Sequence, residues 1–126
     1  MSSEKERTGK VRDIEERTFQ FALDIVRLCQ TVEKKAGTAR ILTLQLLRSV
    51  TSVGANVEEA QAGQSRADFI SKYSVALKES RETRYWLRLM AESQIINSRT
   101  VGPLLKEAIQ LSRILVSIVS RSKQVR

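Results

Sequence analysis

The sequence of 126 residues has no histidine and a single cysteine. Without histidine, the chain cannot build an imidazole general base, a Ser-His-Asp or Cys-His nucleophile, or a histidine ligand for a metal. The histidine-containing di-iron sites of many helical bundles are excluded for the same reason. One cysteine cannot form an internal disulfide, and the apolar neighbours of Cys29 favour a small buried side chain over a reactive thiol. We therefore expect neither enzyme activity nor a cofactor.

Long apolar runs, prolines and glycines are also scarce. No run of about 18 apolar residues is present, so no membrane-spanning helix is expected. The start of the chain, MSSEKERTGKVRD, is charged throughout and lacks the apolar core of a secretion signal. These features predict a cytoplasmic protein without a membrane partner. One proline, five glycines and no strand-like alternation favour a mostly helical fold.

Basic residues outnumber acidic ones by 22 to 14, which gives a net charge of +8. Most of the basic residues are arginines, whose planar guanidinium can bind phosphate through two hydrogen bonds and stack on bases. Such a charge is typical of proteins with an acidic partner, and nucleic acid is the first candidate. It is also compatible with a small domain whose charge serves only solubility.

Apolar residues recur at helical spacing in four segments that are separated by short breaks. The ranges are about 13–36, 39–62, 66–95 and 101–122. Helices of this length, joined by turns of a few residues, predict an all-α, up-down-up-down antiparallel four-helix bundle. Residues 1–12 are expected to form a flexible basic arm, and residues 123–126 a basic tail.

Glycines and capping residues predict where the helices begin and end. Gly37 and Gly63 are expected to terminate the first and second helices, because glycine accepts the left-handed conformation. Thr38 is the expected N-terminal cap of the second helix. Ser65 followed by Asp68 predicts a capping box at the start of the third.

The second helix carries two parallel stripes, and the rest of the bundle is expected to pack around it. One stripe is apolar, at Leu46, Val50, Val53, Val57 and Ala60. The other is polar, short and mostly uncharged, unlike an ordinary solvated face. We interpret it as a structural polar network that fixes helix register, with a binding site as the alternative. Its expected members are Gln45, Ser49, Ser52, Asn56 and Glu59, together with Ser80 of the third helix.

Small residues predict that two helix backbones approach closely. Gly54 lies inside the second helix, where it costs about 1 kcal/mol relative to alanine, and small residues surround it. The core stripe of the third helix is also small in its middle, at Ala76, Ser80 and Thr83. The small stripes of the second and third helices are therefore expected to face each other.

The two flanks of the third helix differ in charge. Glu79 and Glu82 lie on one flank, away from the expected core, where they could pair with Arg48 or with an arginine of a neighbouring subunit. Basic residues and a tyrosine gather on the other flank, which is either a phosphate-binding patch or a solvated face. The nucleic-acid-binding candidates are Lys78, Arg81, Tyr85 and Arg88 on this flank, with Arg121 and Lys123 at the end of the chain.

The fourth helix has more apolar width than one bundle needs, which indicates an assembly surface. Trp86 of the third helix is more readily explained as an aromatic anchor in a subunit contact than as a base-stacking platform. We therefore predict a ring-shaped homo-oligomer. Its expected interface residues are Trp86, Leu105, Ile109, Val116 and Val119.

Two segments resemble a known family. They are RSVTSVGANVEEA, residues 48–60, and SRADFISKYSVALKESRETRYWLRLM, residues 65–90. The chain is similar over about residues 14–122 to the bacterial four-helix-bundle proteins encoded within intervening sequences of 23S ribosomal RNA genes. One departure is Glu58-Glu59-Ala60, where that family usually has Ala-Glu-Gly. The matching residues are Arg48, Ser49, Ser52, Asn56, Glu59, Glu79, Ser80, Glu82, Thr83, Trp86 and Leu87.

The tracts RYWLRLMAESQ and SRILVSIVSR also resemble the accessory variability determinant of diversity-generating retroelements. That resemblance implies a basic, barrel-shaped homopentamer that partners a reverse transcriptase and binds nucleic acid. Asn56 and Glu59, however, resemble the ribosomal-intervening-sequence branch. Neither resemblance implies catalytic residues.

The expected function is therefore that of a non-enzymatic, basic, oligomeric accessory protein that binds RNA or DNA. It would either assist a reverse transcriptase or associate with ribosomal RNA. The alternative is a structural adaptor that binds only protein and has no direct nucleic-acid role.

Overall fold

The computed structural model describes the backbone of residues 2–32 and 36–124, and the side chains of residues 13–32 and 36–124. It contains four helices in these ranges, and no strand among the residues it describes. The helices are α1 (Ser2–Val32), α2 (Thr38–Gln61), α3 (Arg66–Glu92) and α4 (Ser98–Gln124).

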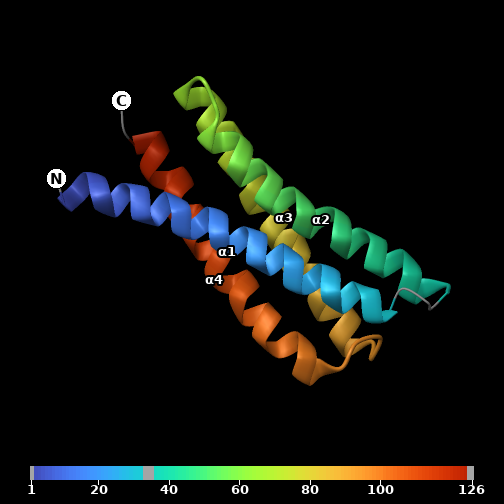
Figure 1. The fold of residues 1–126 in the computed structure, drawn as a ribbon. Coiled ribbons are helices and arrows are strands. Elements are labelled where there is room, and N and C mark those ends of the chain that lie inside the picture. The colour runs from blue at the N-terminus through green and yellow to red at the C-terminus, as the bar shows by residue number, and fades with distance from the viewer. Residues whose placement is uncertain (1, 33–35, 125–126) are drawn as a thin grey trace.

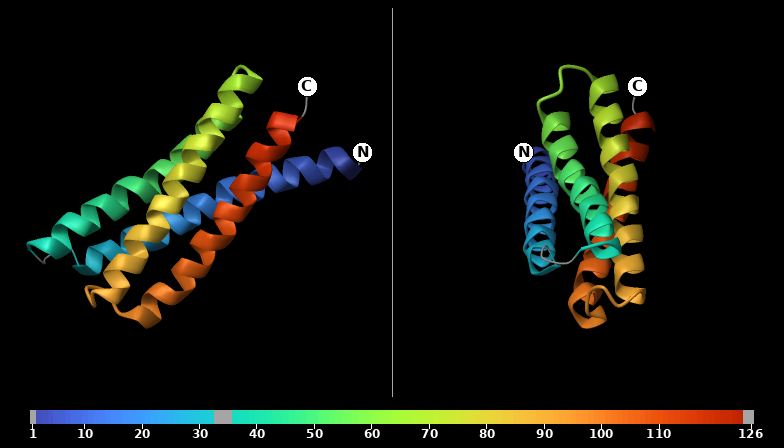
Figure 2. Two further views of the ribbon diagram at one scale, coloured as in Figure 1. Left: turned by 180° about the vertical axis from the view of Figure 1, so that it is seen from behind. Right: turned by 90° about the vertical axis from the view of Figure 1, so that its right-hand side faces the viewer.

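The four helices run alternately up and down, which confirms the predicted antiparallel bundle (Figure 1). Helices that follow one another in the chain pack side by side, and the α2–α3 and α3–α4 pairs have the most extensive contacts. The backbones of the diagonal pairs, α1 with α3 and α2 with α4, do not approach each other in the described residues. Contact between α1 and α4 is limited, because the two helices cross and then diverge (Figures 1 and 2). The α1–α2 face therefore lies opposite the α3–α4 face.

The apolar stripes predicted from the sequence form the core. In α2, Leu46, Val50, Val53 and Val57 have no exposed surface at all. Tyr73, Leu87 and Met90 of α3 and Leu111 and Leu115 of α4 are buried against them. Because the core lines one face of each helix, the remaining faces are free to carry charge.

Helix boundaries differ from the expected ones at several ends. α1 begins at Ser2 rather than near Asp13, and Ala36, its expected end, is not helical. α3 ends at Glu92 rather than near residue 95, because Gln94 has a positive φ of 63° that a helix cannot continue through. α4 begins at Ser98, before residue 101, and the Asn97 side chain accepts a hydrogen bond of 2.8 Å from the Arg99 N–H.

The capping predictions have mixed outcomes. The Ser65 hydroxyl accepts a hydrogen bond of 3.0 Å from the Asp68 N–H, as predicted. Thr38 is not the cap of α2, since Gly37 occupies that position with a φ of 70° and no side-chain hydrogen bond forms there. Gly63 does not have a positive φ. A side chain at Gly63 would lie 2.7 Å from the Asp68 carboxylate, so the Asp68 side chain would have to move to make room for it.

Candidate functional site

The excess positive charge lies on one half of the bundle. α1 and α2 each contain equal numbers of basic and acidic residues and are neutral. α3 contains six basic and four acidic residues, which gives it a net charge of +2. α4 contains five basic residues and one acidic residue, which gives it a net charge of +4. The α3–α4 face is therefore the surface to which a polyanion would be attracted.

The predicted basic flank of α3 is exposed along its whole length. Lys78, Arg81, Tyr85 and Arg88 all reach solvent, and Tyr85 is 58% exposed. Arg88 forms an ion pair of 2.7 Å with Glu92, and this hydrogen bond raises the pKa of Arg88. We call these four residues the α3 basic flank.

Arg121 and Lys123 do not join this flank. They are exposed near the end of α4, which lies beside the start of α3 because the two helices are antiparallel. Arg66, the first residue of α3, donates hydrogen bonds of 3.2 and 2.9 Å to the Ser122 carbonyl at this end. The six predicted residues thus form two separate groups on the same face.

A groove between α3 and α4 brings together arginines that the sequence analysis did not group. Arg81, Arg84 and Arg113 line it, beside Ile109 and Val116, and its volume is about 420 Å³. Among the described residues, none of these three arginines forms an ion pair. The i, i+3 spacing of Arg81 and Arg84 was a usable signal in the sequence, whereas Arg113 joins them only through helix packing. We call this surface the arginine groove.

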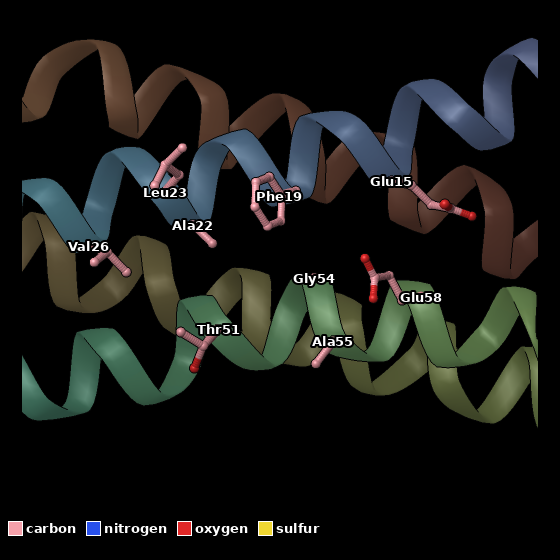
Figure 3. A pocket seen from close by; sticks show the side chains of 9 residues that line it. All are labelled: Glu15, Phe19, Ala22, Leu23, Val26, Thr51, Gly54, Ala55 and Glu58. Atoms are coloured by element: carbon pink, nitrogen blue, oxygen red, sulfur yellow. The ribbon is translucent and has the colours of Figure 1, made fainter.

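A second groove, of about 320 Å³, lies between α1 and α2 (Figure 3). Its apolar surface includes Phe19, which is 63% exposed. Gly54 lies on its floor, and a side chain there would contact the Thr18 carbonyl oxygen of α1 at 3.6 Å, an ordinary van der Waals distance. The atoms nearest to this position therefore belong to α1 and not to α3, and the spacing does not require a glycine. The lining residues are Glu15, Phe19, Ala22, Leu23, Val26, Thr51, Gly54, Ala55 and Glu58.

Acidic residues surround one end of this second groove. Glu15, Glu16 and Glu58 lie there with Phe19. None of the three carboxylates forms an ion pair within the part of the chain that the structure describes. No group of three or more possible metal ligands was found in that part of the chain either. We call this surface the acidic groove.

The predicted interface residues of α4 have different environments. Val116 is 38% exposed, and Leu105 and Ile109 are half-buried. Val119 is only 7% exposed and belongs to the core, so it is not available for a subunit contact. The two most exposed large apolar side chains in the described region lie instead on α1 and α2, at Phe19 and Ile41.

The predicted polar network is divided into separate parts. Ser49 is fully buried, and its hydroxyl accepts a hydrogen bond of 2.9 Å from Thr83 of α3. Ser80 forms a hydrogen bond of 2.8 Å with Ser112, which joins α3 to α4. Thr83 and Ser112 are the partners that the sequence analysis did not include.

The other members of the predicted network make local or surface contacts. Asn56 donates hydrogen bonds of 2.8 and 3.0 Å to the carbonyl and hydroxyl oxygens of Ser52 in its own helix. Gln45 accepts a bond of 3.4 Å from Arg48, and Glu59 pairs with Lys72 at 3.3 Å on the surface. The two serine hydrogen bonds and the exposed Glu59–Lys72 ion pair therefore connect helices, whereas Gln45 and Asn56 bond only within α2.

Comparison with known proteins places these features in a family. Residues 11–117 match the family model of the 23S rRNA-intervening sequence protein. The chain belongs to this family. It is similar to a crystal structure of a protein of unknown function from the S23 ribosomal protein family of Bacteroides thetaiotaomicron VPI-5482. The identity is 36%, the TM-score is 0.80, and the match covers 88% of this chain and 98% of that one. No curated protein matches the chain.

In this member of the 23S rRNA-intervening sequence protein family, several motif residues meet between α2 and α3. Arg48 forms ion pairs with Glu82 and, at 3.5 Å, with Glu79. Trp86 donates a hydrogen bond of 3.4 Å to Glu82 and packs edge-on against Tyr85. Glu79 is 5% exposed, so it does not lie away from the core as predicted. The expected pairing of Arg48 with the two glutamates is present within one subunit.

One further observation concerns the membrane. None of the helices in the described residues is long and apolar enough to cross a bilayer.

Proposed function

We propose that the protein is a non-enzymatic accessory protein that binds the phosphate backbone of RNA or DNA through its α3–α4 face. The observation that carries this proposal is the distribution of charge. The net charges of +2 and +4 belong to adjacent helices, while the opposite half of the bundle is neutral. A uniform basic surface that served only solubility would not need this segregation.

The α3 basic flank suits contact with a flexible nucleic-acid strand. Lys78 and Arg81 are exposed and form no ion pair in the described residues, so their charges are available to phosphates. Binding of this kind gains free energy by releasing counterions, which makes it tolerant of sequence and sensitive to salt. Tyr85 could add stacking on an unpaired base, worth about 1–3 kcal/mol.

The family favours RNA as the ligand, because its name refers to 23S rRNA. Association with ribosomal RNA and assistance to a reverse transcriptase both fit this proposal. We further propose that the protein acts as a homo-oligomer, in which modest contacts from each subunit would combine by avidity.

Binding to mixed-sequence RNA and DNA at salt concentrations from 50 to about 200 mM tests this function. We compare the wild type with Lys78→Glu/Arg88→Glu, and with the control Arg27→Glu/Arg40→Glu, whose exposed residues lie on α1 and α2. The flank variant should bind more weakly and with a shallower salt dependence, whereas the control, with the same change in net charge, should stay close to the wild type. Equal weakening of both variants would show that only net charge matters.

The second candidate function is that of a protein-binding adaptor. The exposed apolar surface of the acidic groove favours it. Phe19, a large aromatic side chain, is 63% exposed there, and exposed apolar surface of this kind often marks a protein-binding site. If the folded wild type binds neither RNA nor DNA at low salt, the adaptor function replaces the first.

A further inference from the structure

The arginine groove between α3 and α4 carries charge of one sign only. Arg81 and Arg84 of α3 and Arg113 of α4 line it, and all three are exposed. None of them forms an ion pair with another described residue, whereas Arg88 of α3 is paired with Glu92 at 2.7 Å. The three guanidinium groups are therefore available to an anionic ligand from both sides of the groove.

Three of the five carboxylates of α3 and α4 pair with residues of the other two helices. Glu79 and Glu82 of α3 form ion pairs with Arg48 of α2. Glu107 of α4 pairs with Arg17 of α1 at 2.6 Å. In the part of the chain that the structure describes, the residues that line the arginine groove include no carboxylate. The packing of the bundle thus leaves the positive charge of the groove unopposed.

The arginine groove also contains apolar surface. Val116 is 38% exposed there, and the half-buried Ile109 lies two helical turns earlier on the same side of α4, about 10 Å away along the axis. Ser112 lies between them and shares a hydrogen bond of 2.8 Å with the buried Ser80. We call Ile109 and Val116 the apolar strip. The groove volume of about 420 Å³ is in the range of sites that hold small molecules.

A nucleotide has the two chemical parts that this groove matches, an anionic phosphate and a flat base. Guanidinium groups bind phosphate through paired hydrogen bonds and also stack on bases. A base can enter the groove only if it is unpaired, because the bases of a duplex are stacked on one another and hydrogen-bonded to their partners.

We propose that the arginine groove binds an unpaired nucleotide of a single-stranded segment, with the phosphates on the three arginines and the base against the apolar strip. This inference rests on the proposed function and specifies its ligand. The nucleic acid is single-stranded where it contacts the groove. Stacking accepts every base, because each base has a flat face, so the site is tolerant of sequence.

A site of this kind differs in a measurable way from a surface that binds phosphates alone. Duplex DNA carries about one charge per 1.7 Å of its axis, so a surface that contacts only phosphates should bind a duplex at least as tightly as a single strand. A groove that also holds a base should bind the single strand more tightly, despite its lower density of charge.

Three ligands of equal length separate the contribution of the base from that of the phosphates. We measure, by fluorescence anisotropy, binding to an unstructured single-stranded RNA of about 12 nucleotides, to the duplex with its complement, and to an abasic strand with the same number of phosphates. The single-stranded RNA should bind about tenfold or more tightly than the abasic strand, because the abasic strand cannot stack. It should also bind more tightly than the duplex.

Substitution of the apolar strip tests the position of the base. Val116→Ser removes apolar surface without a change of charge, and it should weaken binding of the single-stranded RNA by about fivefold while leaving the abasic strand unaffected. The matched control is Val75→Ser, because Val75 of α3 is 39% exposed and lies outside the groove. Circular dichroism checks that both variants are helical.

The variant that tests the proposed function gives a different pattern. Lys78 and Arg88 lie outside the groove, so Lys78→Glu/Arg88→Glu should weaken all three ligands by a similar factor. Arg84→Gln/Arg113→Gln should instead weaken the single-stranded RNA more than the duplex. The two proposals can therefore fail separately.

Four results would overturn the inference. Equal affinity for the single-stranded RNA and the abasic strand, or for the RNA and its duplex, would mean that only phosphates are bound, and the proposed function would stand. Equal binding of the single strand by folded Val116→Ser and Val75→Ser would place the base elsewhere. Polyglutamate of the same charge that displaces the RNA at an equal concentration would show that the groove accepts any polyanion. A wild type that binds none of the three ligands at low salt would overturn both proposals.

Discussion

Tyr73 offers a quantitative test of how α3 packs into the core. Its side chain is 1% exposed, and its hydroxyl accepts a hydrogen bond from the Gln61 amide of α2. Burial, which opposes the charged phenolate, raises the pKa of Tyr73 to about 12, and the nearby Glu15 carboxylate acts in the same direction. A raised pKa means that the folded state holds the phenol proton more tightly than the unfolded chain does. The corresponding stability is complete below pH 10 and is lost as the pH rises through about 12.

The magnitude follows from the difference between the two pKa values. A shift from 10.0 to about 12 corresponds to about 2.7 kcal/mol, of which about 1.4 kcal/mol is lost by about pH 11. Tyr73→Phe removes the titrating group but also the hydrogen bond with Gln61, which should cost about 1 kcal/mol at neutral pH. The variant should therefore be less stable than the wild type at pH 7 and should match or exceed it near pH 11.

Urea unfolding of both proteins at a series of pH values measures this crossover. The difference between the two free energies of unfolding isolates Tyr73, because the many lysines and arginines titrate in both proteins. Tyr85→Phe is the matched control, since it removes the hydroxyl of a tyrosine that is 58% exposed and lies outside the core. A wild type that stays more stable than Tyr73→Phe by the same amount up to about pH 11 would refute the burial of the phenol.

Three further substitutions test the contacts between helices by urea unfolding. Thr83→Val keeps the shape of a fully buried residue but removes its hydrogen bond to Ser49. It should lower the free energy of unfolding by about 1 kcal/mol. An unchanged free energy would show that this bond does not hold α2 to α3. Asn56→Leu should change stability by less than about 0.5 kcal/mol, because its side chain bonds only within its own helix; a larger loss would indicate a partner from another subunit. Glu107→Gln breaks a part-exposed ion pair with Arg17 and should lower the free energy of unfolding by about 0.5 kcal/mol. A larger decrease would mean that this pair anchors α1 to α4.

The outcome for α2 shows how far the sequence could predict the candidate surfaces. Its polar stripe was expected to act as one network, yet Ser49 bonds to α3, Asn56 bonds to its own helix and Glu59 reaches the surface. Equal spacing along a helix places residues on one face but does not say how far a neighbouring helix covers that face. The same reason explains Glu79, which spacing placed on an open flank and packing buried.

The sequence by itself determined the four helices and the residues of their core faces. This information is local, since the helical period alone brings Leu46, Val50 and Val53 to one side, and the Ser65 hydroxyl reaches the Asp68 N–H within one turn. Short connections then required antiparallel neighbours.

Only the tertiary structure decided which side chains from different helices share a surface. It joined Arg113 of α4 to Arg81 and Arg84 of α3, and it placed Glu58 of α2 beside Glu15 of α1. It also left Phe19 exposed while burying Val119, although both lie within amphipathic helices. The crossing of α1 and α4 and the relative rotation of the helices set these distances, and both result from side-chain packing between segments far apart in the chain.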